Sequence, residues 1–336
     1  MTKIQIVTIA TEAGTHFPGQ SRAGEAIYEA GIETKLLKSG HEVVATSTLL
    51  GRAPAVASAA KWQPSPKLDG VRNEQKTLLV LNDVYDELID CLDTDDGRFI
   101  LFLGGDCTIL QPVLSALHAI LHGKKQPILD VGLVYMDGDV DLSVPAEAAA
   151  SIDATGVLDA MTMSHLMRRP GCLPSFSTAR CSSRPDGSAL VTPQNAVFFG
   201  FDPLQPSASH WVYLAENGCK VFTRPTVRTD AVAAAKSALS WLESRFDFIV
   251  LHFDVDVIDS GEFPLANYPH YAGLAAGEAF AALEVFLGSP KVRAMTITEV
   301  NPNNDPERTM VTQVESDQKQ RRWGRPFTLR TPMLDA

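Results

Sequence analysis

The sequence has 336 residues, with 29 Lys and Arg side chains against 40 Asp and Glu, so its formal net charge is −11. No apolar run approaches the roughly 18 residues that a bilayer crossing needs, and a membrane span is therefore excluded. Nucleic acid is not an expected partner, because such binding needs a basic face and the basic cluster at 319–325 is more typical of a solvated surface.

The five cysteines are widely spaced and include no CxxC pair. This pattern argues against a disulfide framework and against a structural zinc site. The chain starts with a strand-like alternation rather than a secretory signal. We therefore expect a reducing compartment, and the prediction for localisation is the cytoplasm.

Short β-rich runs alternate with helix-like stretches in chain order. The predicted strands cover residues 3–9, 41–47, 98–104, 131–137, 196–201, 219–223, 247–254 and 292–300. The predicted amphipathic helices cover residues 73–92, 108–121, 230–246 and 275–287. Near-continuous apolar residues in the strands favour a parallel sheet with helices on both faces. An open sheet and an eight-stranded barrel both fit this spacing.

The chain shows no internal repeat, and we expect one domain over residues 1–336 with a terminal helix and tail at about 305–336. Two connections are long, at 138–195 and 255–276, and both begin directly after an acidic strand end. Long loops in compact domains are usually either functional or disordered.

Four predicted strand ends carry concentrated polar groups, at 104–108, 137–141, 254–256 and 299–302. Ligands of α/β sheets bind at such carboxyl ends. Five aspartates without nearby Lys or Arg repel one another unless solvent or a cation intervenes, and their oxygens suit Mg²⁺ or Mn²⁺. One acidic strand end alone is more often a solvated turn or helix cap, but two clusters and a Gly-Gly-Asp turn together favour a divalent metal pair.

The order of these motifs resembles the ureohydrolase family, the arginase, agmatinase and formiminoglutamase group, whose signatures are GGDHS, DAHxD, SxDxDxxDP and ExNP. Here they stand as GGDCT, DGDVD, HFDVDVIDS and EVNP, and residues 21–32 resemble an early helix of the family. The resemblance implies a three-layer α/β/α fold around an eight-stranded, mainly parallel sheet. It also implies two Mn²⁺ ions, a small guanidino or linear amidine substrate, and a homo-oligomer, either a trimer or a hexamer.

The resemblance further implies a role for each polar residue. One metal takes Cys107, Asp137, Asp141 and Asp254, and the other takes Asp137, Asp139, Asp254 and Asp256. Glu299 holds the cationic nitrogen group of the substrate. Asp159 aligns with a proton-shuttling histidine of the family, and the expected catalytic residues are Glu299, Asp159 and Asp141.

Three departures from the family pattern change the expected chemistry. Cys107 and Asp139 replace histidines, so the ligand shell carries −6, or −5 with a protonated thiol, where four Asp and two His carry −4. A more negative shell should raise the pKa of bound water, which predicts a weaker nucleophile, a higher pH optimum or a single metal. The third departure is Asp159 itself, in a loop without the polar residues that arginases use for the amino-acid end of arginine. Plain arginase activity is therefore not expected.

Several residues keep two interpretations. Cys107 is either a ligand or a small buried residue. His252 points the same way as Asp254, so it is either a donor that supports the ligands or a satisfied core histidine. His165 either restores an imidazole near the site or packs in the core. Asp106 and Asp259 are carboxylates that either support the ligands or form turns. Tyr268 and His270 are substrate-pocket candidates by position alone.

Two other functions remain open at this level. Three chemically important positions are substituted relative to the family. The protein is therefore also consistent with a catalytically silent relative that binds a metal or ligand for regulation or assembly. Asp254-Val255-Asp256-Val257 also fits the short DxDx[TV] pattern of haloacid-dehalogenase-like phosphotransferases. That reading is weak, because such enzymes place the nucleophilic Asp on an early strand.

Overall fold

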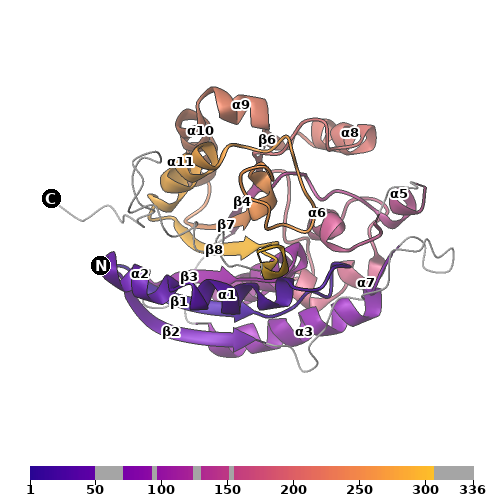
Figure 1. Ribbon diagram of the computed structural model, residues 1–336. Coiled ribbons are helices and arrows are strands. Elements are labelled where there is room, and N and C mark those ends of the chain that lie inside the picture. The colour runs from indigo at the N-terminus through magenta and orange to yellow at the C-terminus, as the bar shows by residue number, and fades with distance from the viewer. Residues whose placement is uncertain (50–70, 93–96, 124–129, 151–154, 306–336) are drawn as a thin grey trace.

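The computed structural model describes residues 1–49, 71–92, 97–123, 130–150 and 155–305 (Figure 1). Eight parallel strands form one sheet in the order β2-β1-β3-β8-β7-β4-β5-β6. β2 and β6 lie at opposite ends of this order, so the sheet is open and the barrel alternative is wrong. The strands are β1 (Lys3–Ile9), β2 (Glu42–Leu49), β3 (Phe99–Leu103), β4 (Val131–Met136), β5 (Ala196–Phe199), β6 (Lys220–Phe222), β7 (Phe248–Asp254) and β8 (Val292–Thr298).

The sequence predicted every one of these eight strands, because buried parallel strands are continuous apolar runs. The four predicted helices are also confirmed, as α3 (Glu74–Cys91), α4 (Leu110–Gly123), α10 (Ala231–Glu243) and α11 (Ala276–Leu287). The expected early helix forms as two pieces, α1 (Ala23–Glu29) and α2 (Ile32–Lys38), because Gly31 between them has φ of 93°. The terminal helix expected at about 305–336 falls outside the described residues beyond Asp305.

Five short helices were not predicted, since four to nine residues give too little periodicity for a signal. The connection 138–195, expected as one long loop, contains three of them. The five short helices are α5 (Pro145–Ala150), α6 (Thr162–Met167), α7 (Pro174–Ser177), α8 (Ala208–Glu216) and α9 (Arg224–Thr229), and the first three lie in this connection.

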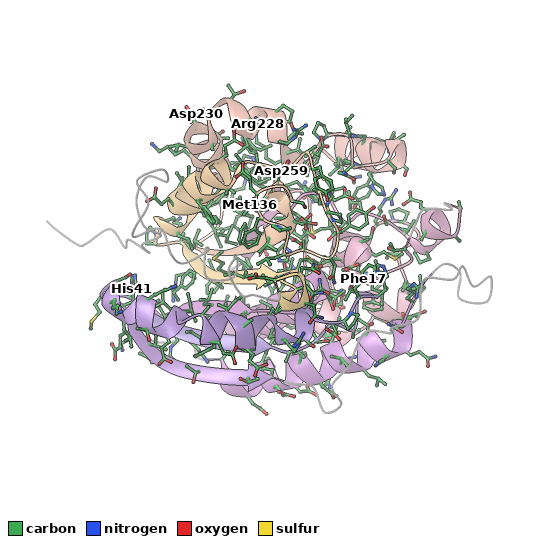
Figure 2. The ribbon with its side chains drawn as sticks, viewed as in Figure 1. Phe17, His41, Met136, Arg228, Asp230 and Asp259 are labelled. Carbon is green, nitrogen blue, oxygen red and sulfur yellow. The ribbon has the colours of Figure 1, made fainter. Side chains whose placement is uncertain are left out.

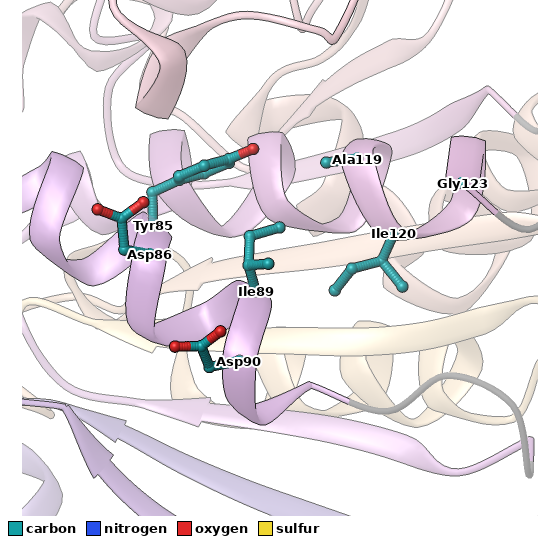
Figure 3. Close-up of a pocket in the computed structure, with 7 residues that line it drawn as sticks. All are labelled: Tyr85, Asp86, Ile89, Asp90, Ala119, Ile120 and Gly123. Carbon is teal, nitrogen blue, oxygen red and sulfur yellow. The ribbon is translucent and has the colours of Figure 1, made fainter.

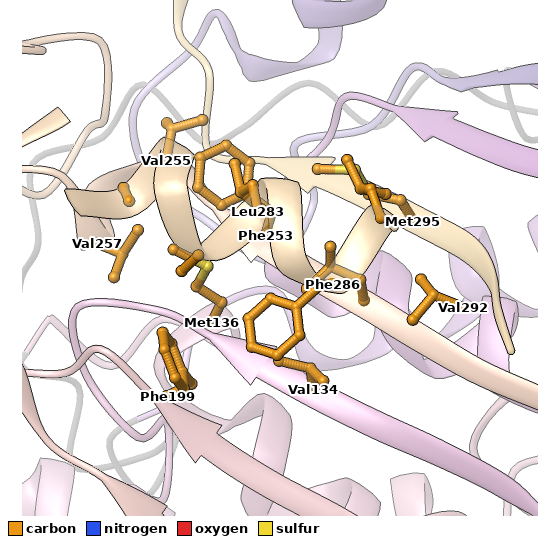
Figure 4. Packing of buried hydrophobic residues seen from close by; sticks show 14 of the residues in the cluster. Val134, Met136, Phe199, Phe253, Val255, Val257, Leu283, Phe286, Val292 and Met295 are labelled. Atoms are coloured by element: carbon orange, nitrogen blue, oxygen red, sulfur yellow. The ribbon is translucent and has the colours of Figure 1, made fainter. Parts of the chain in front are cut away.

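Two hydrophobic clusters cover the two faces of the sheet, which confirms the three-layer α/β/α fold. Helices α1, α2, α9, α10 and α11 pack on one face and α3, α4, α6 and α8 on the other. Successive strand residues alternate between the faces, and in β3 Leu101 joins the first cluster while Phe102 joins the second. Figure 4 shows the first cluster, where Phe286 of α11 lies against Val134 and Phe199 of the sheet.

The strands that carry the four polar motifs are the central neighbours of the sheet, β3, β8, β7 and β4. Because all are parallel, their carboxyl ends meet at one edge. A groove of about 570 Å³ lies elsewhere, between α3 and α4 (Figure 3). It is lined by the carboxyl-terminal parts of these helices, which lie toward the opposite edge of the sheet, and it contains Tyr85, Asp86 and Ile89. Among the described residues, no helix is both long and apolar enough to cross a membrane.

Candidate metal centre

A Gly-Gly turn after β3 directs Cys107 to the edge of the sheet. Gly104 and Gly105 have φ of 92° and 84°, and a Cβ on Gly105 would lie 2.8 Å from the side chain of Ile109. Asp106 holds the next turn, because its Oδ1 accepts from the Thr108 N–H at 3.0 Å. The turn-forming assignment is confirmed for Asp106 and also for Asp259 (Figure 2), whose Oδ1 accepts from the Gly261 N–H at 2.8 Å.

Four buried side chains from three motif segments converge here, and we call them the four-donor cluster. One potential ligand atom from each lies within 4.8 Å of each of the others. The cluster offers a sulfur, an imidazole nitrogen and two carboxylate oxygens. Its members are Cys107, Asp137, His252 and Asp254.

His252 enters the cluster from a polar row across three neighbouring strands. It pairs in register with Tyr135 of β4 and Thr296 of β8. Its ring stacks on Tyr135, with centroids 4.7 Å apart, and its Nδ1 lies 2.7 Å from the Thr296 hydroxyl. Burial lowers the pKa of His252 to about 3, so the imidazole is neutral at physiological pH. Its Nε2 lies 3.4 Å from the Cys107 sulfur.

The Cys107 thiol donates to Oδ2 of Asp254 at 2.8 Å. Burial and the Asp254 charge raise the pKa of Cys107 well above its usual range, so the thiol is protonated in the metal-free protein. Burial, followed by repulsion from Asp256, also raises the pKa of both Asp137 and Asp254. The ionised form of the group is therefore unfavourable without a cation.

Three other aspartates predicted as ligands lie at the same strand ends but outside the four-donor cluster, and we call them the paired carboxylates. Asp256 accepts from the Gly138 N–H at 3.0 Å and pairs with His270 at 3.1 Å. Asp141, which has φ of 46°, accepts from the Tyr135 hydroxyl. Asp139 accepts from the Val140 N–H at 2.7 Å. Each has a hydrogen-bond donor within the protein.

The connection 255–276 brings His270 into the site, although its sequence position alone had suggested only a pocket residue. His270 is buried, whereas Tyr268 two residues earlier is exposed. Burial lowers the pKa of the imidazole, but Asp256 outweighs that effect and raises it to about 9. Burial likewise raises the pKa of Asp256, and His270 reverses the direction, so the net pKa is lowered. The two therefore form a buried ion pair in the metal-free protein.

Glu299 follows β8 with φ of 65° and lies directly beside the four-donor cluster. Its Oε1 accepts from the Cys107 N–H at 3.0 Å, and its Oε2 accepts from the Gln20 amide. Burial, and then the charge of Asp159, raise the pKa of Glu299 well above its usual range. Gln20 was missed by sequence reasoning, since 279 residues separate it from Glu299 and no motif includes it.

Asp159 and His165 lie on the same connection but have different surroundings. Asp159 accepts from the Ala160 N–H at 2.7 Å, and burial, with the charge of Asp106, raises its pKa to about 8. His165 is fully buried in α6 and stacks on Phe176, with centroids 4.4 Å apart. It does not restore an imidazole to the site, and the core-packing interpretation is the correct one.

One buried oxygen of the four-donor cluster lacks a hydrogen-bond partner in the part of the chain that the structure describes. Oδ2 of Asp137 is buried, and no hydrogen bond within the described residues reaches it. A buried carboxylate oxygen without a partner is costly, and a cation placed among the four donors satisfies it. The residues therefore fit a metal.

Comparisons with known proteins agree with this architecture. The model of the arginase family matches residues 2–316. Arginase from Bacillus cereus superimposes with a TM-score of 0.74 at 19% identity, covering 93% of this chain and 95% of that one. Formimidoylglutamase from Bacillus subtilis gives a TM-score of 0.64 at 15% identity, covering 93% and 83%. Trypanosoma cruzi formiminoglutamase with Mn²⁺ gives 0.61 at 17% identity, covering 93% and 91%.

At these identities the structural likeness shows the fold, while the family match spans nearly the whole chain. Proteins of this family are metallohydrolases that use a binuclear metal centre, often with Mn²⁺. In this chain Asp254 ends the seventh strand rather than an early one, so the phosphotransferase alternative has no support. The chain belongs to the arginase family.

Proposed function

We propose that this chain is a metal-dependent hydrolase that cleaves a C–N bond of a guanidino or linear amidine compound other than arginine. The observation that carries the proposal is the buried four-donor cluster with Glu299 directly beside it. Asp137 and Asp254 are the carboxylates through which the metal would be held. When bound, a divalent cation lowers the pKa of water and supplies a nucleophile near neutral pH.

The surrounding residues position the substrate and move the proton. Glu299 is a counter-charge for the cationic nitrogen group, and Gln20 together with the Cys107 N–H fixes its carboxylate. Asp159 has a pKa of about 8, so it is largely protonated at pH 7. It can hold the proton that the leaving nitrogen requires. Asp141, the third catalytic candidate, is positioned by the Tyr135 hydroxyl.

The test is a panel of guanidino and formimino compounds with and without added Mn²⁺ or Zn²⁺, with release of urea, ammonia or formamide as the readout. We expect one compound to give metal-dependent product and Asp254→Asn to abolish it. Asp230→Asn is the matched control, because Asp230 only caps α10 by accepting from Ala233 N–H at 2.9 Å. A panel without any metal-dependent product contradicts the proposal.

A second candidate is a catalytically silent relative, and one observation favours it. The paired carboxylates have donors within the protein, so part of the acidic site is stable without a second metal. This candidate predicts an intact fold without turnover. The trimer or hexamer implied by the family remains a prediction, and light scattering coupled to size-exclusion chromatography measures it.

A further inference from the structure

We propose that the four-donor cluster binds a single Zn²⁺ ion through one thiolate, one imidazole and two carboxylates. This inference deepens the proposed function and rests on its metal requirement, but it does not require turnover. The family resemblance implies two manganese ions, whereas the proposed centre contains one zinc ion with a sulfur ligand. The residues concerned are Cys107, Asp137, His252 and Asp254.

Ligand chemistry selects the metal. Carboxylate and water oxygens suit Mn²⁺ and Mg²⁺, whereas a thiolate favours zinc and other softer ions. Cys107 replaces the histidine of the family motif, and His252 stands two residues before Asp254, where the family has serine. The chain therefore exchanges one nitrogen donor for sulfur and gains another nitrogen donor within 3.4 Å of it. Cysteine, histidine and aspartate are all established zinc ligands.

The distances fit one small ion. With Zn–S of about 2.3 Å and Zn–N of about 2.05 Å, tetrahedral geometry separates sulfur from nitrogen by about 3.5 Å. The observed distance from the Cys107 sulfur to Nε2 of His252 is 3.4 Å. The sulfur lies 2.8 Å from Oδ2 of Asp254 because the thiol proton bridges them, and a metal that replaces this proton separates the two atoms. Asp137 contributes the buried oxygen that lacks a hydrogen-bond partner.

The imidazole is oriented as a ligand requires. Zinc-bound histidines usually donate their second ring nitrogen to an oxygen, which fixes the tautomer. Here Nδ1 of His252 lies 2.7 Å from the Thr296 hydroxyl. In the tautomer that a metal ligand requires, Nδ1–H donates to that oxygen and Nε2 presents its lone pair to the cluster. Stacking on Tyr135 fixes the plane of the ring.

A second metal would have to compete with hydrogen bonds that two of its expected ligands already accept. Of the carboxylates assigned to it by the family resemblance, Asp256 is held by the Gly138 N–H and His270, and Asp139 by the Val140 N–H. Neither residue belongs to the four-donor cluster. Asp137 and Asp254 also accept backbone hydrogen bonds, from the Asp139 N–H at 2.7 Å and the Asp256 N–H at 2.8 Å. What distinguishes the cluster is Oδ2 of Asp137, a buried carboxylate oxygen without a hydrogen-bond partner among the described residues.

The experiment uses the full chain, freed of metal with a chelator and then titrated with Zn²⁺, Mn²⁺ or Co²⁺. Elemental analysis after desalting should give one zinc per chain, and zinc should displace manganese in competition. Co²⁺ reports on the ligands, because a thiolate bound to cobalt adds a charge-transfer band in the near ultraviolet. We expect that band in the wild type.

Variants identify the donors. Cys107→Ser should remove the charge-transfer band. His252→Asn keeps a polar group near Thr296 but removes the donor at the Nε2 position. It should weaken zinc binding by at least about 100-fold, because losing a residue that only orients a ligand already costs roughly 10- to 100-fold. Asp256→Asn is the matched control among the paired carboxylates and should keep one zinc and the cobalt band. A thermal melt of each variant verifies folding.

Two manganese ions per chain, or a wild-type cobalt complex without the thiolate band, overturn the proposal even when no variant folds. Unchanged zinc affinity in folded His252→Asn also overturns it. These results are separate from the substrate panel. Turnover with two manganese ions supports the proposed function against this inference, and a zinc site without turnover supports this inference against the proposed function.

Discussion

The four-donor cluster and the paired carboxylates occupy the same edge of the sheet but solve the same electrostatic problem differently. In the cluster, a carboxylate oxygen of Asp137 is buried without a hydrogen-bond partner, and the Cys107 thiol donates to Asp254. Among the paired carboxylates, His270 and Tyr135 supply the compensation from within the chain. Buried carboxylates need either a cation or protein donors. The paired carboxylates have protein donors, and the proposed zinc ion would supply the cation for the four-donor cluster.

The largest expected difference is in metal affinity. Asp137→Asn should weaken zinc binding by at least about 100-fold, because it removes a ligand rather than a residue that orients one. Asp141→Asn is the matched change among the paired carboxylates and should cost less than about tenfold. Isothermal titration of the metal-free variants measures both. Equal losses would erase the distinction between the two groups of aspartates.

The next test converts the site toward the family pattern. Replacing Cys107 and Asp139 together with histidine reduces the negative charge of the shell and restores two nitrogen donors. We expect manganese content to rise to two ions per chain, measured by elemental analysis after desalting. Each single replacement serves as a control and should leave fewer than two. A double variant that still retains no more than one manganese ion shows that the two substitutions do not control stoichiometry.

Loss of His270 should destabilise the metal-free protein by about 3 kcal/mol, since breaking a buried ion pair leaves one charge uncompensated. The pKa of His270 is raised from 6.5 to about 9, so its contribution is complete below pH 6.5 and is lost as the pH rises through 9. The pKa of Asp256 is lowered, so its contribution is lost as the pH falls below 3.8.

His270→Gln should therefore differ most from the wild type between about pH 4 and pH 6.5. Denaturant unfolding from pH 5 to pH 10 measures the difference, which should decline above pH 6.5, and the same change at exposed His122 is the control. A constant difference from pH 5 to pH 10 contradicts the ion pair.

The smallest expected effect concerns His165. Its imidazole is outside the four-donor cluster and has no protein hydrogen-bond partner among the described residues. Both ring nitrogens lack hydrogen-bond partners within the described residues, and burial lowers the pKa to about 3. The neutral form is favoured by folding, so stability is complete above pH 6.5 and falls as the pH decreases toward 3. At pH 5 the loss is about 2 kcal/mol. His165→Leu should remove this component, as unfolding at pH 7.5 and pH 5 will show, and His122→Leu should not.

How far the sequence predicts the site depends on sequence separation. Asp137, Asp139 and Asp141 belong to one short motif, so their proximity follows from the chain itself. His252 and Asp254 share a strand face because side chains alternate, which was also predictable. Cys107 and His252 are 145 residues apart, and only the pairing of β3, β8 and β7 brings them together.

The sequence by itself determined the eight strands, the parallel sheet and the four polar strand ends, because apolar runs and motif spacing are local properties. Only the tertiary structure decided which side chains compensate the buried polar groups of the site. His270 reaches Asp256 through the fold of its loop, Gln20 reaches Glu299 from the other end of the chain, and His165 turns into the core. Burial and charge compensation depend on every neighbour in three dimensions, and no local pattern encodes them.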